Sequence, residues 1–150
     1  MKRVANEDLF LGDDYALYDE GKPFTGVSYE NRPDGSLWSE MTYVRGLQHG
    51  PSRTLYPNGQ VQTEMQYKMA YADGWAEEWY PDGALKRRTL YELAVPVREQ
   101  EFNRKGELIR EVAIDPSSEA YRRLEVARRN EDARLDRIYA TFGRPVAGET

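Results

Sequence analysis

The sequence predicts a mainly β protein, an extended antiparallel sheet of stacked β-hairpin repeats with a C-terminal α-helix packing on it or capping it. Two observations carry this prediction. The turn sequence YPNGQ at residues 56–60 returns as YPDGA at residues 80–84, and the stretch after each turn alternates apolar and polar side chains. Alternation with a period of two is typical of half-buried strands, and Pro-Asn-Gly or Pro-Asp-Gly favours a tight turn.

The repeat continues along most of the chain. The turn glycines Gly35, Gly59, Gly83 and Gly106 are separated by 24, 24 and 23 residues, and several other columns keep the same step. A period of this length indicates supersecondary units that are stable only when stacked. We therefore expect one array over residues 1–114. Its expected parts are an N-terminal edge (1–26) and units at 27–49, 50–73, 74–97 and 98–114.

The strand after each turn indicates which side chains share a face. In QVQTEMQY (60–67), Val61, Thr63, Met65 and Tyr67 are expected on one face, and the glutamine and glutamate side chains on the other. A sheet with one apolar face needs a covering layer. The sequence therefore predicts that another element packs over this face.

Residues 115–143 are predicted to form a helix that supplies this cover. Asp115 is a suitable N-cap, Pro116 suits the first helical position, and Gly143 suits the end of the helix. Arg, Asp and Glu balance one another within the segment, which indicates a solvated outer face. Residues 144–150 are expected to form a flexible tail.

Composition excludes several classes of protein. The chain has no cysteine, so it contains no disulfides, thiolate metal sites or thiol nucleophile. Its net charge of -5 disfavours nucleic acid as a partner. There is no apolar run long enough to cross a bilayer, and the first ten residues lack the apolar segment of a secretory signal. We expect a cytoplasmic protein without membrane contacts, cofactor or metal.

Three sequence signals together carry a family resemblance: PFTG (23–26), GLQHG (46–50), and YP[ND]G followed by a strand that ends in Tyr. Residues 21–114 resemble the bacterial MORN-variant repeat, as found in the YwqK-like family of antitoxins and immunity proteins of polymorphic toxins. The resemblance implies an extended sheet of hairpins without cofactor or catalysis. Ala70 departs from the pattern because it stands where Gly46 stands one unit earlier, and residues 115–150 lie outside the resemblance.

A search for catalytic chemistry finds little. His49 is the only histidine, it has no partner at metal-ligand spacing, and we interpret it as a turn residue of the repeat. Glu77 and Glu78 are adjacent on a strand, so they point to opposite faces and cannot share a proton or a metal. We expect that the protein is not an enzyme.

Two groups of side chains are candidates for partner contact. The acidic residues Asp13, Asp14, Asp19 and Glu20 lie in a segment that either forms a solvated terminus or displays carboxylates toward a basic partner. The aromatic residues Tyr56, Trp79 and Tyr80 flank the repeat turns. Aromatic side chains concentrate at interface hot spots, although cross-strand pairing would also explain them.

These observations predict an antitoxin or immunity protein that binds a cognate toxin, expected to have a basic surface, and occludes its active site. The alternative is a structural scaffold or adaptor that mediates protein contacts or, with less support, lipid contacts. An open sheet also has edges, so homo-oligomers through those edges are a further expectation.

Overall fold

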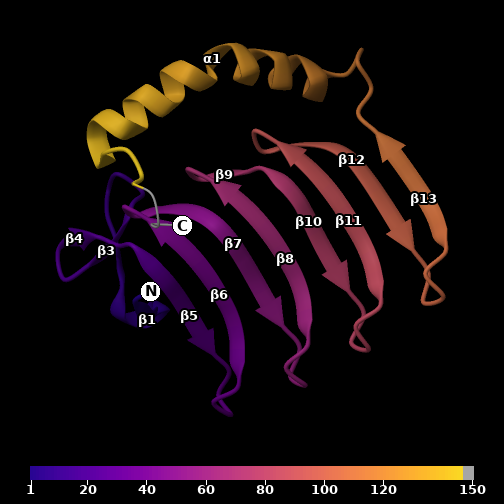
Figure 1. The fold of residues 1–150 in the computed structure, drawn as a ribbon, viewed down its shortest axis with the longest axis horizontal. Helices are drawn as coiled ribbons and strands as arrows, with labels where there is room; N and C mark the ends of the chain where they lie inside the picture. The colour runs from indigo at the N-terminus through magenta and orange to yellow at the C-terminus, as the bar shows by residue number, and fades with distance from the viewer. Residues whose placement is uncertain (147–150) are drawn as a thin grey trace.

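The structure is a computed structural model that describes residues 1–146. It confirms the predicted fold class, because hairpin strands build one large sheet and a single long helix follows them (Figure 1). The strand order of the sheet is β1-β5-β6-β7-β8-β10-β11-β12-β13, with β9 (Tyr71–Ala72) paired to β8. Its other strands are β1 (Arg3–Ala5), β5 (Gly26–Asn31), β6 (Leu37–Val44), β7 (Leu47–Leu55), β8 (Val61–Lys68), β10 (Gly74–Trp79), β11 (Leu85–Glu92), β12 (Val95–Phe102) and β13 (Leu108–Ala113).

The turns that the sequence predicted have the expected chemistry. A side-chain oxygen of Asp34, Asn58 or Asp82 accepts a hydrogen bond from the backbone N–H two residues later, at 2.9–3.0 Å. The glycine that follows each of them is left-handed, with φ of 84°, 83° and 89°. Both features close a tight turn, which explains why the chain repeats the same residues at this position.

The strict alternation predicted along each strand is wrong near these turns. Lys86 and Arg87 are neighbours in sequence, yet both form ion pairs with Glu78 at 2.8 Å and so lie on the same side of the sheet. The cause is a β-bulge, which sets two residues of one strand against one residue of the other. Register shifts recur at the same place in the other hairpins. Val61, before its bulge, therefore does not share a face with Thr63, as strict alternation required.

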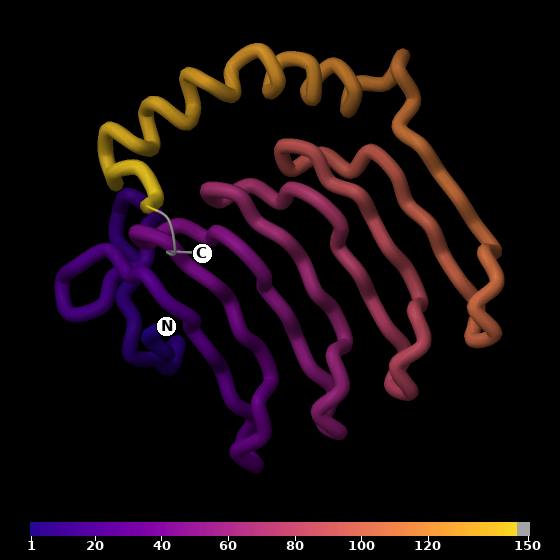
Figure 2. The backbone as a smooth tube through the Cα atoms, in the orientation of Figure 1, coloured from indigo at the N-terminus to yellow at the C-terminus, as the bar shows by residue number. Residues whose placement is uncertain are grey.

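A second set of turns joins successive units at the opposite strand ends. These turns are Arg45–Gly46, Met69–Ala70 and Leu93–Ala94, and every residue in them has a positive φ. The second residue of each turn donates its N–H to a carbonyl 22 residues earlier, on Phe24, Gln48 and Ala72, at 2.7–2.8 Å. Ala70 and Ala94 thus keep the geometry of Gly46, which explains how the repeat tolerates the loss of that glycine. Figure 2 shows the resulting hairpins side by side.

The helix α1 (Glu119–Phe142) corrects two expectations. It begins later than predicted, because the side chain of Ser118, and not of Asp115, caps it by accepting a hydrogen bond from the N–H of Tyr121 at 3.1 Å. Asp115 instead accepts the N–H of Ser117 in the preceding turn at 2.8 Å. Of the two expected arrangements, covering a face is wrong and capping agrees with the structure: the helix runs across the strand ends, over the turns between units (Figure 1).

The core therefore sits at that end of the sheet. Its buried side chains include Val44 and Leu47 beside one inter-unit turn, Met69 and Ala72 at the next, and Leu124 on the helix. Away from this core, the middle strands are half-buried on both faces; every residue of β10, for example, has intermediate exposure. The array is a single-layer sheet that presents both faces.

The N-terminal part of the chain also differs from the expected antiparallel edge. β1 pairs with β5 in parallel, so the sheet is mixed at this end. Between them in sequence, after a short 3-10 helix at Asn6–Asp8, the chain forms a separate antiparallel sheet of β2 (Phe10–Leu11), β3 (Leu17–Asp19) and β4 (Lys22–Pro23). We call residues 8–23 the N-terminal lobe. The predicted tail lies partly outside the described residues, and within them Arg144 forms an ion pair with Asp136 at 3.7 Å.

Candidate interaction surface

The structure brings three of the four predicted acidic residues together. Asp13 and Asp14 lie in the turn between β2 and β3, and Glu20 lies in the turn between β3 and β4. All three line one hollow on the N-terminal lobe, together with Asp8 and Phe10. The lobe packs against the Arg45–Gly46 turn, where a Cβ on Gly46 would lie 2.8 Å from the Cβ of Ala16.

The fourth predicted residue, Asp19, has another role. Its carboxylate forms an ion pair and hydrogen bond with the ammonium group of Lys2. The same contact raises the pKa of Lys2 above its ordinary value. Asp19 thus ties the lobe to the strand before it, and its charge is matched within the chain.

Asp14 stabilises the turn of the lobe in addition to contributing negative charge. One carboxylate oxygen accepts a hydrogen bond from the Tyr18 hydroxyl at 2.7 Å, and the other accepts the N–H of Ala16 at 3.1 Å. These two bonds hold the pKa of Asp14 below its ordinary value, with the Tyr18 bond the larger cause. The turn is closed by backbone bonds as well, from the N–H of Tyr15 to the carbonyl of Gly12 at 3.0 Å and from that of Gly12 to Ala16 at 2.9 Å.

The tip of this turn carries a residue that sequence reasoning missed. Tyr15 is 84% exposed and has a φ of 61°, a left-handed conformation that is uncommon for a tyrosine. Phe10 and Leu11, in β2 of the same lobe, are 69% and 60% exposed. A strained, closed turn that holds an aromatic side chain in solvent is a recognised feature of binding loops. The sequence signal that could have indicated Tyr15 was Asp-Asp-Tyr at residues 13–15, a turn sequence that ends in an aromatic residue.

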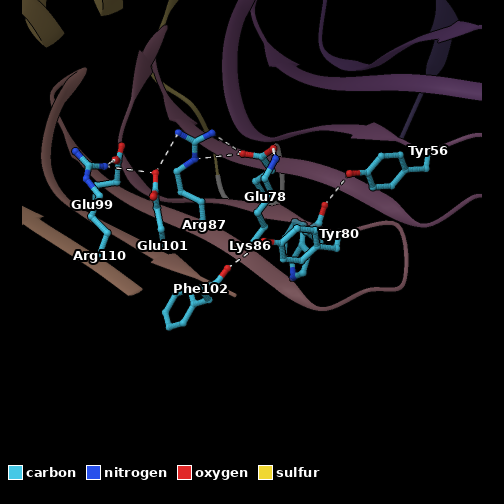
Figure 3. A network of polar contacts seen from close by, with 10 residues as sticks. Tyr56, Glu78, Tyr80, Lys86, Arg87, Glu99, Glu101, Phe102 and Arg110 are labelled. Carbon is cyan, nitrogen blue, oxygen red and sulfur yellow. Dashed lines mark hydrogen bonds and ion pairs between the residues drawn. The ribbon is translucent and has the colours of Figure 1, made fainter. Parts of the chain in front are cut away.

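The predicted aromatic residues lie at the other end of the strands and connect adjacent hairpins. The hydroxyl of Tyr56 donates a hydrogen bond to the carbonyl of Trp79 at 2.8 Å, and that of Tyr80 donates to the carbonyl of Phe102 at 3.2 Å (Figure 3). Each bond links a turn to the next unit along the array. The structure thus separates these three residues from the acidic lobe and gives the hydroxyls of Tyr56 and Tyr80 partners within the sheet.

Charged side chains form a network on the sheet near these aromatic residues (Figure 3). Glu78 accepts hydrogen bonds from Lys86 and Arg87, while Arg110 on the last strand bridges Glu99 and Glu101. Although partial burial opposes the ionisation of Glu78, its two cationic partners hold its pKa below the ordinary value. Opposite charges satisfy one another across this face, which makes it a poor site for a small charged ligand.

His49 has a structural role, but its interpretation as a turn residue is wrong, because it lies within strand β7. Its Nδ1 accepts the backbone N–H of Met69 at 3.2 Å, and Thr25 accepts the N–H of Arg45 one unit earlier at 2.9 Å. Burial first, and then the charge of Lys68, lower the pKa of His49. Among residues 1–146 no group of three or more His, Cys, Asp or Glu side chains could hold a metal ion. In the same range, no helix combines the length and the apolar character needed to cross a bilayer.

Comparison with known proteins identifies the repeat. The family model of the MORN repeat variant matches residues 48–69, the unit that contains β8 and most of β7. The resemblance to this repeat is confirmed for that unit, while the assignment to an antitoxin family stays a prediction. No curated protein matches the chain.

Among solved structures, the chain is similar to one described as the crystal structure of accessory secretory protein 1, 2 and 3 in Streptococcus pneumoniae. The two share 10% sequence identity with a TM-score of 0.39, over 70% of this chain and 19% of that one. This chain thus spans about a fifth of the length of that solved chain.

Proposed function

We propose that this protein is an antitoxin or immunity protein, which binds a cognate toxin through its N-terminal lobe and occludes the toxin's active site. The observation that carries the proposal is the lobe itself, where Tyr15 is 84% exposed on the closed turn that also holds Asp13 and Asp14, and these two residues line a hollow with Glu20. An apolar anchor within an acidic rim fits a partner that has an apolar pocket within a basic surface.

Binding would proceed in two physical steps. The carboxylates attract a basic toxin surface and accelerate the encounter, an effect that weakens as salt increases. Tyr15, with Phe10 also exposed on the same lobe, then fills a pocket on the toxin and slows dissociation. Because Asp14 already fixes the turn, little conformational entropy is lost on binding, which favours affinity. Toxins that cleave nucleic acid need a positive surface, so they are the partner class with the best electrostatic fit.

A second candidate is a scaffold that holds other proteins together. The match to the MORN repeat variant and the single-layer sheet, with both faces presented, favour it. A scaffold would use the sheet faces, whereas an antitoxin of the proposed kind would use the lobe.

Co-expression tests the proposal. The full chain is produced together with the product of each gene beside its own, and both cell growth and co-purification are measured. We expect rescue of growth and a stable complex. A complex without rescue would favour the scaffold, while neither rescue nor complex would overturn the antitoxin function.

Charge reversal then tests the role of the lobe. Asp13→Lys with Glu20→Lys should lower the association rate constant about tenfold or more at low salt. These two side chains are chosen because Asp14 and Asp19 also hold the lobe together. The matched control is Glu125→Lys with Asp132→Lys, an equal change in net charge on the exposed surface of α1. Equal association rates for the two variants would contradict steering by the lobe.

A further inference from the structure

The two ends of the large sheet are unequal. At one end β1 has only three residues and lies beside the N-terminal lobe. At the other end all six residues of β13 are exposed, and within residues 1–146 no strand pairs with its outer edge (Figure 1). An exposed edge of this length is a template for another strand.

The backbone groups that this edge offers follow from its pairing with β12. The N–H of Ile114 donates to the carbonyl of Val97 at 2.9 Å, so Ile114 directs its backbone groups inward. Inward and outward groups alternate along a strand, so those of Val112 and Arg110 also point to β12. The N–H and C=O groups of Glu111 and Ala113 point outward and can bond to an added strand.

The charged side chains of β13 do not protect its outer edge from pairing with another strand. Arg110 pairs with Glu99 at 2.5 Å and with Glu101 at 3.4 Å, and Glu111 pairs with Arg98. All three partners lie on β12, so the charges of β13 are matched along the sheet. Lysine and proline, which commonly protect edge strands, are absent from Leu108–Ala113. Three large apolar side chains are exposed instead, Leu108 at 48%, Ile109 at 63% and Val112 at 43%.

We propose that a second copy of this chain pairs with this edge, through an antiparallel β13–β13 contact centred on Val112. The two copies would be related by a two-fold axis perpendicular to the sheet, which keeps equivalent faces on the same side. In each possible register this axis passes beside one residue, which lies opposite the same residue of the second copy. Centring on Arg110 or Glu111 sets like charges directly opposite one another, and centring on Ala113 sets Glu111 opposite Asp115. Such pairs are destabilising.

The register centred on Val112 has none of these conflicts. It sets Val112 against Val112 of the second copy, Arg110 against Ile114, and Glu111 against Ala113. The outward backbone groups of Glu111 and Ala113 then bond to each other in both directions. The two sheets become one continuous sheet. Because β1 differs from β13, the assembly closes as a dimer and does not extend into a fibre. A contact of one six-residue strand is small, so the dimer should dissociate on dilution.

Sedimentation of the full chain tests the proposal. We expect the mass to approach twice the 17.4 kDa of one chain as concentration rises. Val112→Lys and Val112→Glu should each be monomeric, because each places like charges face to face, and an equal mixture of the two should dimerise again. Circular dichroism checks that both variants are folded. A wild-type chain that is monomeric at every concentration would overturn the proposal, and so would a mixture that stays monomeric.

A cysteine variant tests the register. The chain has no cysteine, so Val112→Cys introduces a single thiol. Opposed residues in a pair without hydrogen bonds have Cα atoms about 4.5 Å apart, which permits a disulfide. Oxidised Val112→Cys should therefore form a covalent dimer. The control Ile109→Cys should not, because its two thiols would lie about 20 Å apart along the strands. Equal cross-linking of both variants would contradict this register.

Discussion

Single residues in the inter-unit turns carry measurable strain. Ala70 and Ala94 are both exposed and left-handed, with φ of 72° and 66°, at the position where the first such turn has Gly46. A left-handed conformation costs an L-residue about 1–2 kcal/mol, whereas glycine adopts it freely. Gly46 is required for a further reason, because a Cβ there would lie 3.0 Å from the carbonyl oxygen of Leu17.

Replacing one alanine should therefore stabilise the protein. We expect Ala94→Gly to raise the free energy of unfolding by about 0.5 kcal/mol, because the relief of strain exceeds the added entropy of the unfolded chain. Urea denaturation measures the change. The control Ala76→Gly, within β10, should lower stability by about 0.5–1 kcal/mol. A loss of stability in Ala94→Gly equal to that of the control would show that this turn is unstrained.

His49 makes stability depend on pH. Its folded pKa is lower than the 6.5 of an unperturbed histidine, so the unfolded chain binds the proton more tightly. The stabilisation is complete above pH 6.5 and declines as pH falls from 6.5 toward the folded pKa. Because His49 is the only histidine and carboxylates titrate at lower pH, the melting temperature should fall in this window.

The matched variant for this prediction is His49→Thr. Threonine performs the same task at Thr25, where its hydroxyl accepts the N–H of Arg45 and does not titrate. Between pH 6.5 and 5.5, the melting temperature of the variant should change less than that of the wild type. Equal slopes for the two proteins would show that protonation of His49 does not affect folding.

Among the strands, pairing across the sheet decides which charged side chains stabilise it. Glu77 on β10 lies directly opposite Glu64 on β8. Arg88 and Arg53 lie opposite these two residues on the outer neighbouring strands, but their guanidinium groups bond to Gln100 and Glu40 instead, and within residues 1–146 neither carboxylate forms an ion pair. Glu78, the neighbour of Glu77, is on the other face with Lys86 and Arg87. Two adjacent glutamates therefore have opposite effects on the sheet.

The same substitution at both positions checks this difference. Glu77→Gln should raise the free energy of unfolding by about 0.2–1 kcal/mol, because it removes a like-charge pair across the strands. Glu78→Gln should lower it, because its two ion pairs lose their anion. Both effects should shrink in high salt. Chemical denaturation at two salt concentrations measures them, and changes of the same sign would contradict the pairing.

At the scale of the whole molecule, α1 connects units that otherwise contact only their neighbours. Arg128 pairs with Glu92, and Arg134 donates to the carbonyl of Met69 at 2.8 Å and stacks over Tyr71 at 3.8 Å. Near the end of the helix, Arg45 donates to the carbonyl of Phe142 at 3.2 Å. One helix thus contacts two inter-unit turns and the residue just before the third, which should make the array unfold as one body.

Weaker packing of α1 should therefore destabilise all three inter-unit turns. Leu124 is fully buried, so Leu124→Ala should cost about 2–5 kcal/mol. Hydrogen exchange should accelerate at Arg45–Gly46, Met69–Ala70 and Leu93–Ala94 together. The control Val126→Ala, at a side chain that is 46% exposed, should change little. Faster exchange confined to the turn nearest Leu124 would show that the units unfold independently.

The period, the hairpins and their turns could be predicted from local patterns, because they depend on chemistry that each unit repeats. Asp34, Asn58 and Asp82 bond within their own turns, so no distant contact was needed to predict them. The bulges could not be predicted, because a bulge depends on which residues of two strands meet. The helix cap was predicted wrongly for another reason: Asp115 and Ser118 both suit an N-cap, and Asp115 closes the preceding turn while Ser118 caps the helix.

Only the tertiary structure decided where the helix lies and which candidate side chains share a surface. Alternation along a strand shows two faces but not which one is covered, and α1 covers neither, because it runs across the strand ends (Figure 1). The acidic residues proved to belong to a separate lobe with Tyr15 at its tip, while Tyr56 and Tyr80 bond to the next hairpin. Long-range packing sets these relations, and it involves residues that no local pattern connects.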